Sequence, residues 1–89
     1  MTPGFLAAFD ALPRGTFSGR AQGRRYVVSR SDFAGGASAK LVAHELDGPD
    51  YISLNLYRLA SGARLRLCEM SRAKVEAFVL SLVPDAPDG

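Results

Sequence analysis

The sequence predicts an α+β fold, in which a four-stranded antiparallel sheet (a meander) carries a short N-terminal helix and a C-terminal helix packed on one face. Residues 51–57 alternate between polar and aliphatic side chains, with Ile52, Leu54 and Leu56 on one side, which is the pattern of a half-buried strand. Residues 75–82 instead space their apolar side chains at i, i+3, i+4 and i+7, which is one face of a helix. At 89 residues and 47% hydrophobic content, the chain suits a single domain over residues 1–89.

The elements follow from local signals along the chain. The N-terminal helix is expected within residues 1–13, with Thr2 as its N-cap, Pro3 at its first position and Pro13 preventing continuation. Residues 14–23 contain three glycines and are interpreted as a loop or an irregular edge strand. Strands are expected at residues 24–30, 38–46, 50–59 and 63–68, so that the sheet occupies residues 14–70. Ser71 is expected to cap the C-terminal helix over residues 71–83, and residues 84–89 to form a frayed tail.

Composition limits the class of protein. Nine of the eleven basic residues are arginine, which is explained either by the codon bias of a GC-rich bacterial genome or by selection for the planar guanidinium. The sequence contains no apolar run near the roughly 20 residues of a membrane-spanning helix and no secretory signal at its N-terminus. The single cysteine, Cys68, cannot form an internal disulfide. We therefore expect a cytoplasmic protein without a membrane partner.

Few residues suggest catalysis. His44 is the only histidine, which excludes metal motifs with several histidines, and the carboxylates have no spacing that defines an acid–base pair. Cys68 stands just before the C-terminal helix, where it is either a small buried side chain or a thiol with a redox function. We expect a non-enzymatic protein with no catalytic residue, no metal and no cofactor.

The strongest functional signal is the sheet surface away from the core. If Ile52, Leu54 and Leu56 face the core, two tyrosines and two arginines share the opposite face of neighbouring strands. Aromatic rings that stack on bases, set among cations that neutralise phosphates, favour binding of single-stranded nucleic acid. The candidate binding residues are Arg24, Arg25, Tyr26, Lys40, Tyr51, Asn55, Tyr57, Arg64 and Arg66.

Two questions about this surface stay open at the level of sequence. Tyrosine and arginine are also enriched at protein interfaces, so a homodimer or another protein-interaction module explains the same residues. The facing of Lys40 and His44 is undecided, because Val42 lies on their side of the strand while Leu41 lies on the other.

The segment Arg25-Tyr26-Val27-Val28, with the glycine turn that follows it, looks like the first strand of the positive-cofactor-four family of single-stranded-DNA-binding transcriptional coactivators. Leu41 to Leu46 looks like that family's second strand, and the order of elements from Arg24 to Leu82 resembles the family as a whole. The resemblance implies a homodimer that binds single strands on its sheet. It implies binding roles for Arg25, Lys40, Arg64 and Arg66, and places Phe78 and Leu82 near a dimer contact.

Overall fold

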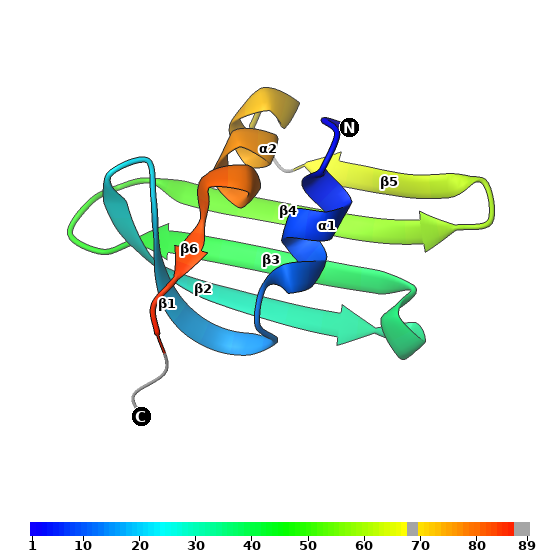
Figure 1. Cartoon of the computed structure of the whole chain (residues 1–89), viewed down its shortest axis with the longest axis horizontal. Coiled ribbons are helices and arrows are strands. Elements are labelled where there is room, and N and C mark those ends of the chain that lie inside the picture. Colours follow the sequence, from blue (N-terminus) through cyan, green and yellow to red (C-terminus); the bar gives the residue numbers. More distant parts are fainter. Residues whose placement is uncertain (68–69, 87–89) are drawn as a thin grey trace.

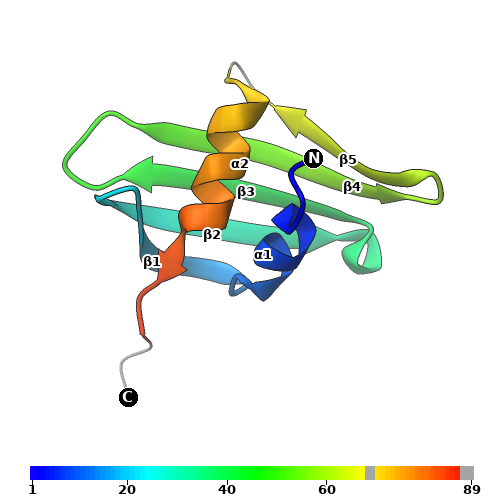
Figure 2. The same ribbon diagram turned by 45° about the horizontal axis from the view of Figure 1, so that its top comes forward.

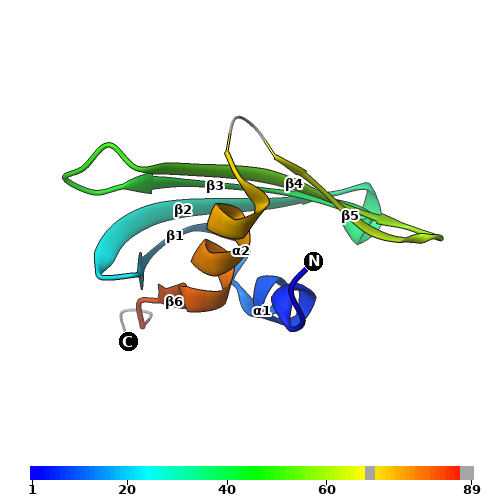
Figure 3. The same ribbon diagram turned by 90° about the horizontal axis from the view of Figure 1, so that it is seen from above.

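The computed structural model describes residues 1–67 and 70–86. Within them, six antiparallel strands form one sheet in the order β5-β4-β3-β2-β1-β6. The strands are β1 (Gly15–Ala21), β2 (Arg24–Phe33), β3 (Ser38–Glu45), β4 (Tyr51–Leu59), β5 (Gly62–Leu67) and β6 (Val83–Pro84). The helices are α1 (Phe5–Ala11) and α2 (Arg72–Ser81), with a short 3-10 turn at Ala34–Gly36. Both helices lie on the same face of the sheet (Figures 1 and 3).

The α+β class and the antiparallel sheet are confirmed, but the predicted number of four strands is wrong. The four expected strands form β2 to β5 and are joined in the expected meander. The glycine-containing segment before them forms an additional regular strand, β1, which pairs with β2 from Gly15 to Ala21. Gln22 and Gly23 connect these strands with φ values of 53° and 78°, which is the signature of a type I′ hairpin turn.

The second additional strand is β6, and it lies where the end of the helix and the start of a frayed tail were expected. Val83 pairs with Arg20 and Pro84 with Gly19, and the amide of Asp85 donates to the carbonyl of Ser18 at 2.8 Å. A Cβ atom on Gly19 would lie 2.9 Å from the carbonyl oxygen of Val83. A glycine at position 19 therefore allows the C-terminal segment to approach β1 closely enough to pair.

Helix α1 begins later than expected. Its N-cap is Gly4, with a φ of 85° and no side-chain hydrogen bond, so the predicted capping by Thr2 is wrong. With seven residues and about two turns, α1 is too short to be stable by itself in water. Its stability must therefore come from tertiary contacts, with α2 and with the sheet.

Arg30 of β2 supplies the main polar contact between α1 and the sheet. Its side chain is only 4% exposed, and Nη1 donates to the carbonyls of Phe9 at 2.7 Å and Leu12 at 2.9 Å. Its Nε donates to Asp32 at 3.2 Å, and the guanidinium lies 4.5 Å from the centre of the Phe9 ring. The buried cation thus adds a second hydrogen bond to the carbonyl of Phe9, which also accepts from the amide of Leu12 at 3.1 Å, and it binds the carbonyl of Leu12 just beyond the helix. The helix dipole also favours positive charge at this end of α1.

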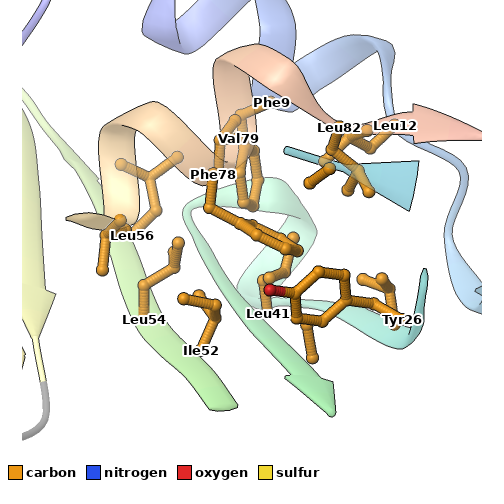
Figure 4. Packing of buried hydrophobic residues seen from close by; sticks show 14 of the residues in the cluster. Phe9, Leu12, Tyr26, Leu41, Ile52, Leu54, Leu56, Phe78, Val79 and Leu82 are labelled. Atoms are coloured by element: carbon orange, nitrogen blue, oxygen red, sulfur yellow. The ribbon is translucent and has the colours of Figure 1, made fainter. Parts of the chain in front are cut away.

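The core lies between the two helices and the sheet. Phe78 of α2 meets Tyr26 edge to face at a ring-centre distance of 4.8 Å, above the buried aliphatic side chains of β3 and β4 (Figure 4). Ile52, Leu54 and Leu56 are buried, as the alternation of β4 predicts. Phe78 and Leu82, which the family resemblance places near a dimer contact, are buried within the chain's own core.

Ser71 caps α2 as predicted, because its hydroxyl accepts a hydrogen bond from the amide of Lys74 at 3.1 Å. Helix α2 ends at Ser81, before the predicted limit of residue 83. Neither helix in residues 1–67 and 70–86 has the length and apolar character required to cross a membrane.

We expect Arg30→Met to lower the free energy of unfolding by about 3 kcal/mol or more, because it removes the buried cation from the end of α1 and from Asp32. Urea denaturation followed by circular dichroism measures this change. Arg14→Met is the matched control, since Arg14 also binds Asp32, at 2.8 Å, but its side chain is 75% exposed. Equal losses of stability in the two variants would show that burial of Arg30 is not what holds α1.

Candidate nucleic-acid interface

The strand register assigns each residue of the sheet to one of two faces, because directly opposed residues in antiparallel strands point to the same side. We call the side without helices the open face; in Figure 2, α1 and α2 both lie on the other side. Four rows of opposed residues that include β3 and β4 cross the open face, and two of them continue into β5. They are His44 with Tyr51, Val42 with Ser53, Lys40 with Asn55 and Arg66, and Ser38 with Tyr57 and Arg64.

The structure brings six of the nine candidate residues together on this part of the open face. They are Lys40, Tyr51, Asn55, Tyr57, Arg64 and Arg66. The facing of β3, which the sequence left undecided, is settled with Lys40 and His44 on the open face and Leu41 in the core. The His44 ring lies beside Tyr51, with 5.0 Å between ring centres.

Tyr26 and Arg24 do not belong to the open face, and placing them there is wrong. Tyr26 is 1% exposed, and its hydroxyl donates to Asp50 at 2.6 Å. Arg24 lies on the same side, 3.7 Å from Asp50. The apolar run from Tyr26 to Val28 has no alternation, so its sequence does not reveal which side is buried.

Arg25 does lie on the open face, but on β2 and outside the group on β3 to β5. It stands opposite Arg20 of β1, and its guanidinium donates to Asp85 at 2.8 Å. Asp85 follows β6, so the C-terminal segment neutralises this cation. Arg25 is therefore engaged within the chain rather than joined to the group on β3 to β5.

The two faces of the sheet differ in charge. On the helix-covered side, Asp32 binds Arg14 and Arg30, while Asp10 binds Arg58. Glu45 and Asp50 also belong to that side, since Glu45 stands opposite the buried Tyr26. Carboxylates thus accompany the cations on the covered side.

The open face of β3 to β5 is different. Among the residues that the structure describes there, the cationic side chains are those of Lys40, Arg64 and Arg66. No described residue of this surface is a carboxylate, and none of the three cations forms an ion pair with a described residue. This separation gives the open face a positive potential that the net charge of +2 does not reveal.

Two exposed apolar residues also lie on the open face and were not anticipated. Phe33 is 54% exposed and stands opposite Ser38, which separates it from Tyr57 in the same row, while Leu59 is 50% exposed at the end of β4. Phe33 was missed because the strand was expected to end at Arg30. Continuing the alternation from Val27 by steps of two residues would have placed it on this face.

A shallow hollow of about 400 Å³ lies on the β4–β5 hairpin, between the last residues of β4 and the residues of β5 that follow the turn. It is lined by Tyr57, Leu59, Arg64, Leu65 and Arg66. The hollow thus combines two guanidinium groups, one aromatic ring and aliphatic side chains, which suits a ligand with anionic and flat apolar parts.

Other chemistry has little support in the described part of the chain. Residues 1–67 and 70–86 contain no group of three or more His, Cys, Asp or Glu side chains that could hold a metal ion. Cys68, the candidate redox thiol, lies outside the described residues.

No protein-family model, curated protein sequence or solved structure matches the chain. The resemblance to the positive-cofactor-four family therefore stays a prediction from the sequence.

Asp50 fixes the inward position of Tyr26 and joins α2 to the sheet. Lys74 of α2 donates to its Oδ1 at 2.7 Å, and Tyr26 donates to its Oδ2 at 2.6 Å. The hydrogen bond from Lys74, followed by that from Tyr26, lowers the pKa of the Asp50 carboxyl below its ordinary value of 3.8. A lowered pKa in the folded state stabilises the fold above pH 3.8, and this stabilisation is lost as the pH falls through the lower, folded-state value.

We expect Asp50→Asn to lower the free energy of unfolding at pH 7 by about 1–3 kcal/mol, because the variant no longer offers a charged acceptor to Lys74 and Tyr26. The variant should also lose less stability than the wild type below about pH 4, since it has no carboxyl to protonate at this position. Urea denaturation at a series of pH values measures both effects. Asp47→Asn, at an exposed turn residue, is the control, and an equal loss of stability there would contradict the role of Asp50.

Proposed function

We propose that the open face binds single-stranded nucleic acid without strong sequence preference, as a binding function rather than a catalytic one. The observation that carries this proposal is the separation of charge, which leaves Lys40, Arg64 and Arg66 together on a surface that also bears Tyr51 and Tyr57. Cations neutralise phosphates whatever the sequence, and aromatic rings stack on any base. The three cations would contact the backbone while the tyrosines stack on bases.

The spacing of the rings indicates the length of strand that would be bound. Tyr51 and Tyr57 are six residues apart on β4, or about 20 Å along an extended strand. Phe33 lies two strands away from Tyr57, at about 10 Å across the sheet. Rings so far apart would stack on bases that are not adjacent, with the row from Lys40 to Arg66 crossing between the two tyrosines. A site of this kind needs at least about four nucleotides.

We expect replacement of both Arg64 and Arg66 by alanine to weaken binding and reduce its salt dependence. Each phosphate that the variant no longer neutralises should change the slope of log K against log salt concentration by about 0.7. The measurement is fluorescence anisotropy of a labelled oligothymidine of about 12 nucleotides at several salt concentrations between about 50 and 200 mM. Unchanged affinity and slope would exclude these arginines from the site.

A single-residue comparison separates a local site from general attraction to a basic protein. Arg66→Ala and Arg72→Ala remove the same charge, but Arg72 lies at the start of α2, on the covered side. We expect Arg66→Ala to weaken binding and Arg72→Ala to have little effect. Equal effects would indicate that the oligonucleotide is not bound at the open face.

A second candidate function is supported by the exposure of Phe33 and Leu59. Exposed apolar side chains beside Tyr57 are also what a protein interface requires, so the open face could instead be the contact of a homodimer or of another protein. On that alternative, the surface is buried by a partner and does not take up bases.

Substitutions that keep apolar bulk but remove rings distinguish these candidates. If bases stack on the open face, Phe33→Leu and Tyr57→Leu should each weaken oligonucleotide binding by about 1–3 kcal/mol, or roughly 5- to 150-fold. Sedimentation equilibrium without nucleic acid measures self-association of the same variants. The protein interface would be favoured if the wild type and both variants were dimers and the wild type did not bind the oligonucleotide.

A further inference from the structure

The free edge of β5 is a second surface with recognisable chemistry. β5 is the outermost strand of the sheet and pairs only with β4 among the described residues (Figure 1). A strand at a sheet edge presents unpaired amides and carbonyls that another extended chain can bond. The side chains on either side of β5 decide which chain could do so.

The hydrogen-bond pattern of β4 identifies the backbone groups of β5 that are free. The amide of Arg58 donates to the carbonyl of Ala37 at 2.7 Å, across the β3–β4 boundary. Hydrogen-bonded and non-hydrogen-bonded pairs alternate in antiparallel strands, so the even-numbered residues of β4 bond to β3 and the odd-numbered residues bond to β5. Tyr57 is odd-numbered and pairs with Arg64. The even-numbered residues of β5 therefore bond to β4.

The odd-numbered residues of β5 then direct their amides and carbonyls away from the sheet. These residues are Ala63, Leu65 and Leu67, and their side chains are half-buried at the margin of the core. Between them, Arg64 and Arg66 project from the open face and are exposed. The edge thus alternates between an apolar and a cationic side chain, with free backbone groups at each apolar position.

We propose that this edge binds an extended peptide strand in which acidic and apolar residues alternate. Acidic side chains on the open-face side of such a strand would lie opposite Arg64 and Arg66, and its apolar side chains would lie beside Leu65 at the margin of the core. Opposite charges across strands stabilise pairing, and the free backbone groups supply a ladder of hydrogen bonds. Arg64 and Arg66 also line the hollow formed with Tyr57, Leu59 and Leu65, so the acidic side chains of the bound peptide would lie next to this hollow.

A second copy of β5 fits this edge less well. In antiparallel pairing centred on Leu65, Arg64 of one copy would stand opposite Arg66 of the other. Pairing centred on Arg64 or Arg66 would place that arginine opposite itself. Like charges directly opposite one another destabilise strand pairs, and charged side chains on edges are a known protection against self-pairing. The same arginines that oppose a second copy favour an acidic strand.

The probe is a fluorescein-labelled synthetic peptide of alternating glutamate and valine, compared with a peptide of equal length in which lysine replaces glutamate. We expect anisotropy titration to detect binding of the glutamate peptide and at least tenfold weaker binding of the lysine peptide. Backbone NMR should show the largest changes at the amides of Ala63, Leu65 and Leu67. Equal binding of the two peptides, or changes located elsewhere, would overturn the proposal.

Two variants test the edge itself. Leu65→Pro removes an outward amide that takes no part in the β4–β5 ladder, so it should abolish peptide binding while circular dichroism shows an intact fold. The double variant Arg64→Glu with Arg66→Glu should reverse the preference in favour of the lysine peptide, which provides a test that does not depend on proline. The proposal would be overturned if Leu65→Pro left peptide binding unaffected. It would also be overturned if the wild type dimerised with increasing concentration and Leu65→Pro abolished the dimer, because this result would assign the edge to another copy of the chain.

The peptide proposal can fail separately from the nucleic-acid proposal. Ala63→Pro also removes an outward amide of β5 but keeps Arg64, Arg66 and every other residue that lines the hollow. This variant should therefore weaken peptide binding while oligonucleotide binding is unchanged. If both activities exist, the glutamate peptide and the oligonucleotide should compete, because both need these two arginines.

Discussion

The buried guanidinium of Arg30 determines how this small fold is layered. It donates hydrogen bonds to the carbonyls of Phe9 and Leu12, and Asp32 supplies the negative charge beside it. A buried cation is tolerated only where its hydrogen bonds are satisfied, and α1 is too short to persist without a partner. The guanidinium therefore needs the carbonyls at the end of α1 as acceptors, and α1 needs the guanidinium as a contact with the sheet. This contact fastens α1 to the face that α2 covers with Val75, Phe78 and Val79, so both helices lie on one side and the other side is left to solvent.

The distribution of charge follows from this layering. Asp10, Asp32 and Asp50 hold the helices and loops in place by binding cations on the covered side. Carboxylates used in this way are not available to cations elsewhere, and in the described part of the chain Lys40, Arg64 and Arg66 have no carboxylate beside them on the open face. A chain with a formal charge of only +2 thus has one face much more basic than its composition suggests.

The sequence predicted the parts of the fold that depend on local pattern and missed those that depend on tertiary contacts. The alternation in β4 and β5 correctly separated Leu54 and Leu56 from the tyrosines and arginines, because one face of these strands is buried and the other is not. Strand β6 was missed because it depends on the space left by Gly19, which no local signal reveals. The position of Tyr26 was missed because apolar residues occupy both sides of β2. Most of the candidate site was therefore predictable, whereas its boundary was not.

The short strand β6 has a consequence for assembly. By pairing with Gly19 and Arg20, it occupies part of the edge opposite β5 with the chain's own backbone, and Pro84 offers no amide for a further strand. A sheet grows into a fibre only if strands can be added at both of its edges. In the described part of the chain, β6 and its proline shorten the stretch of this edge that another strand could pair with, so a complex formed through β5 has little backbone at the far edge from which to extend.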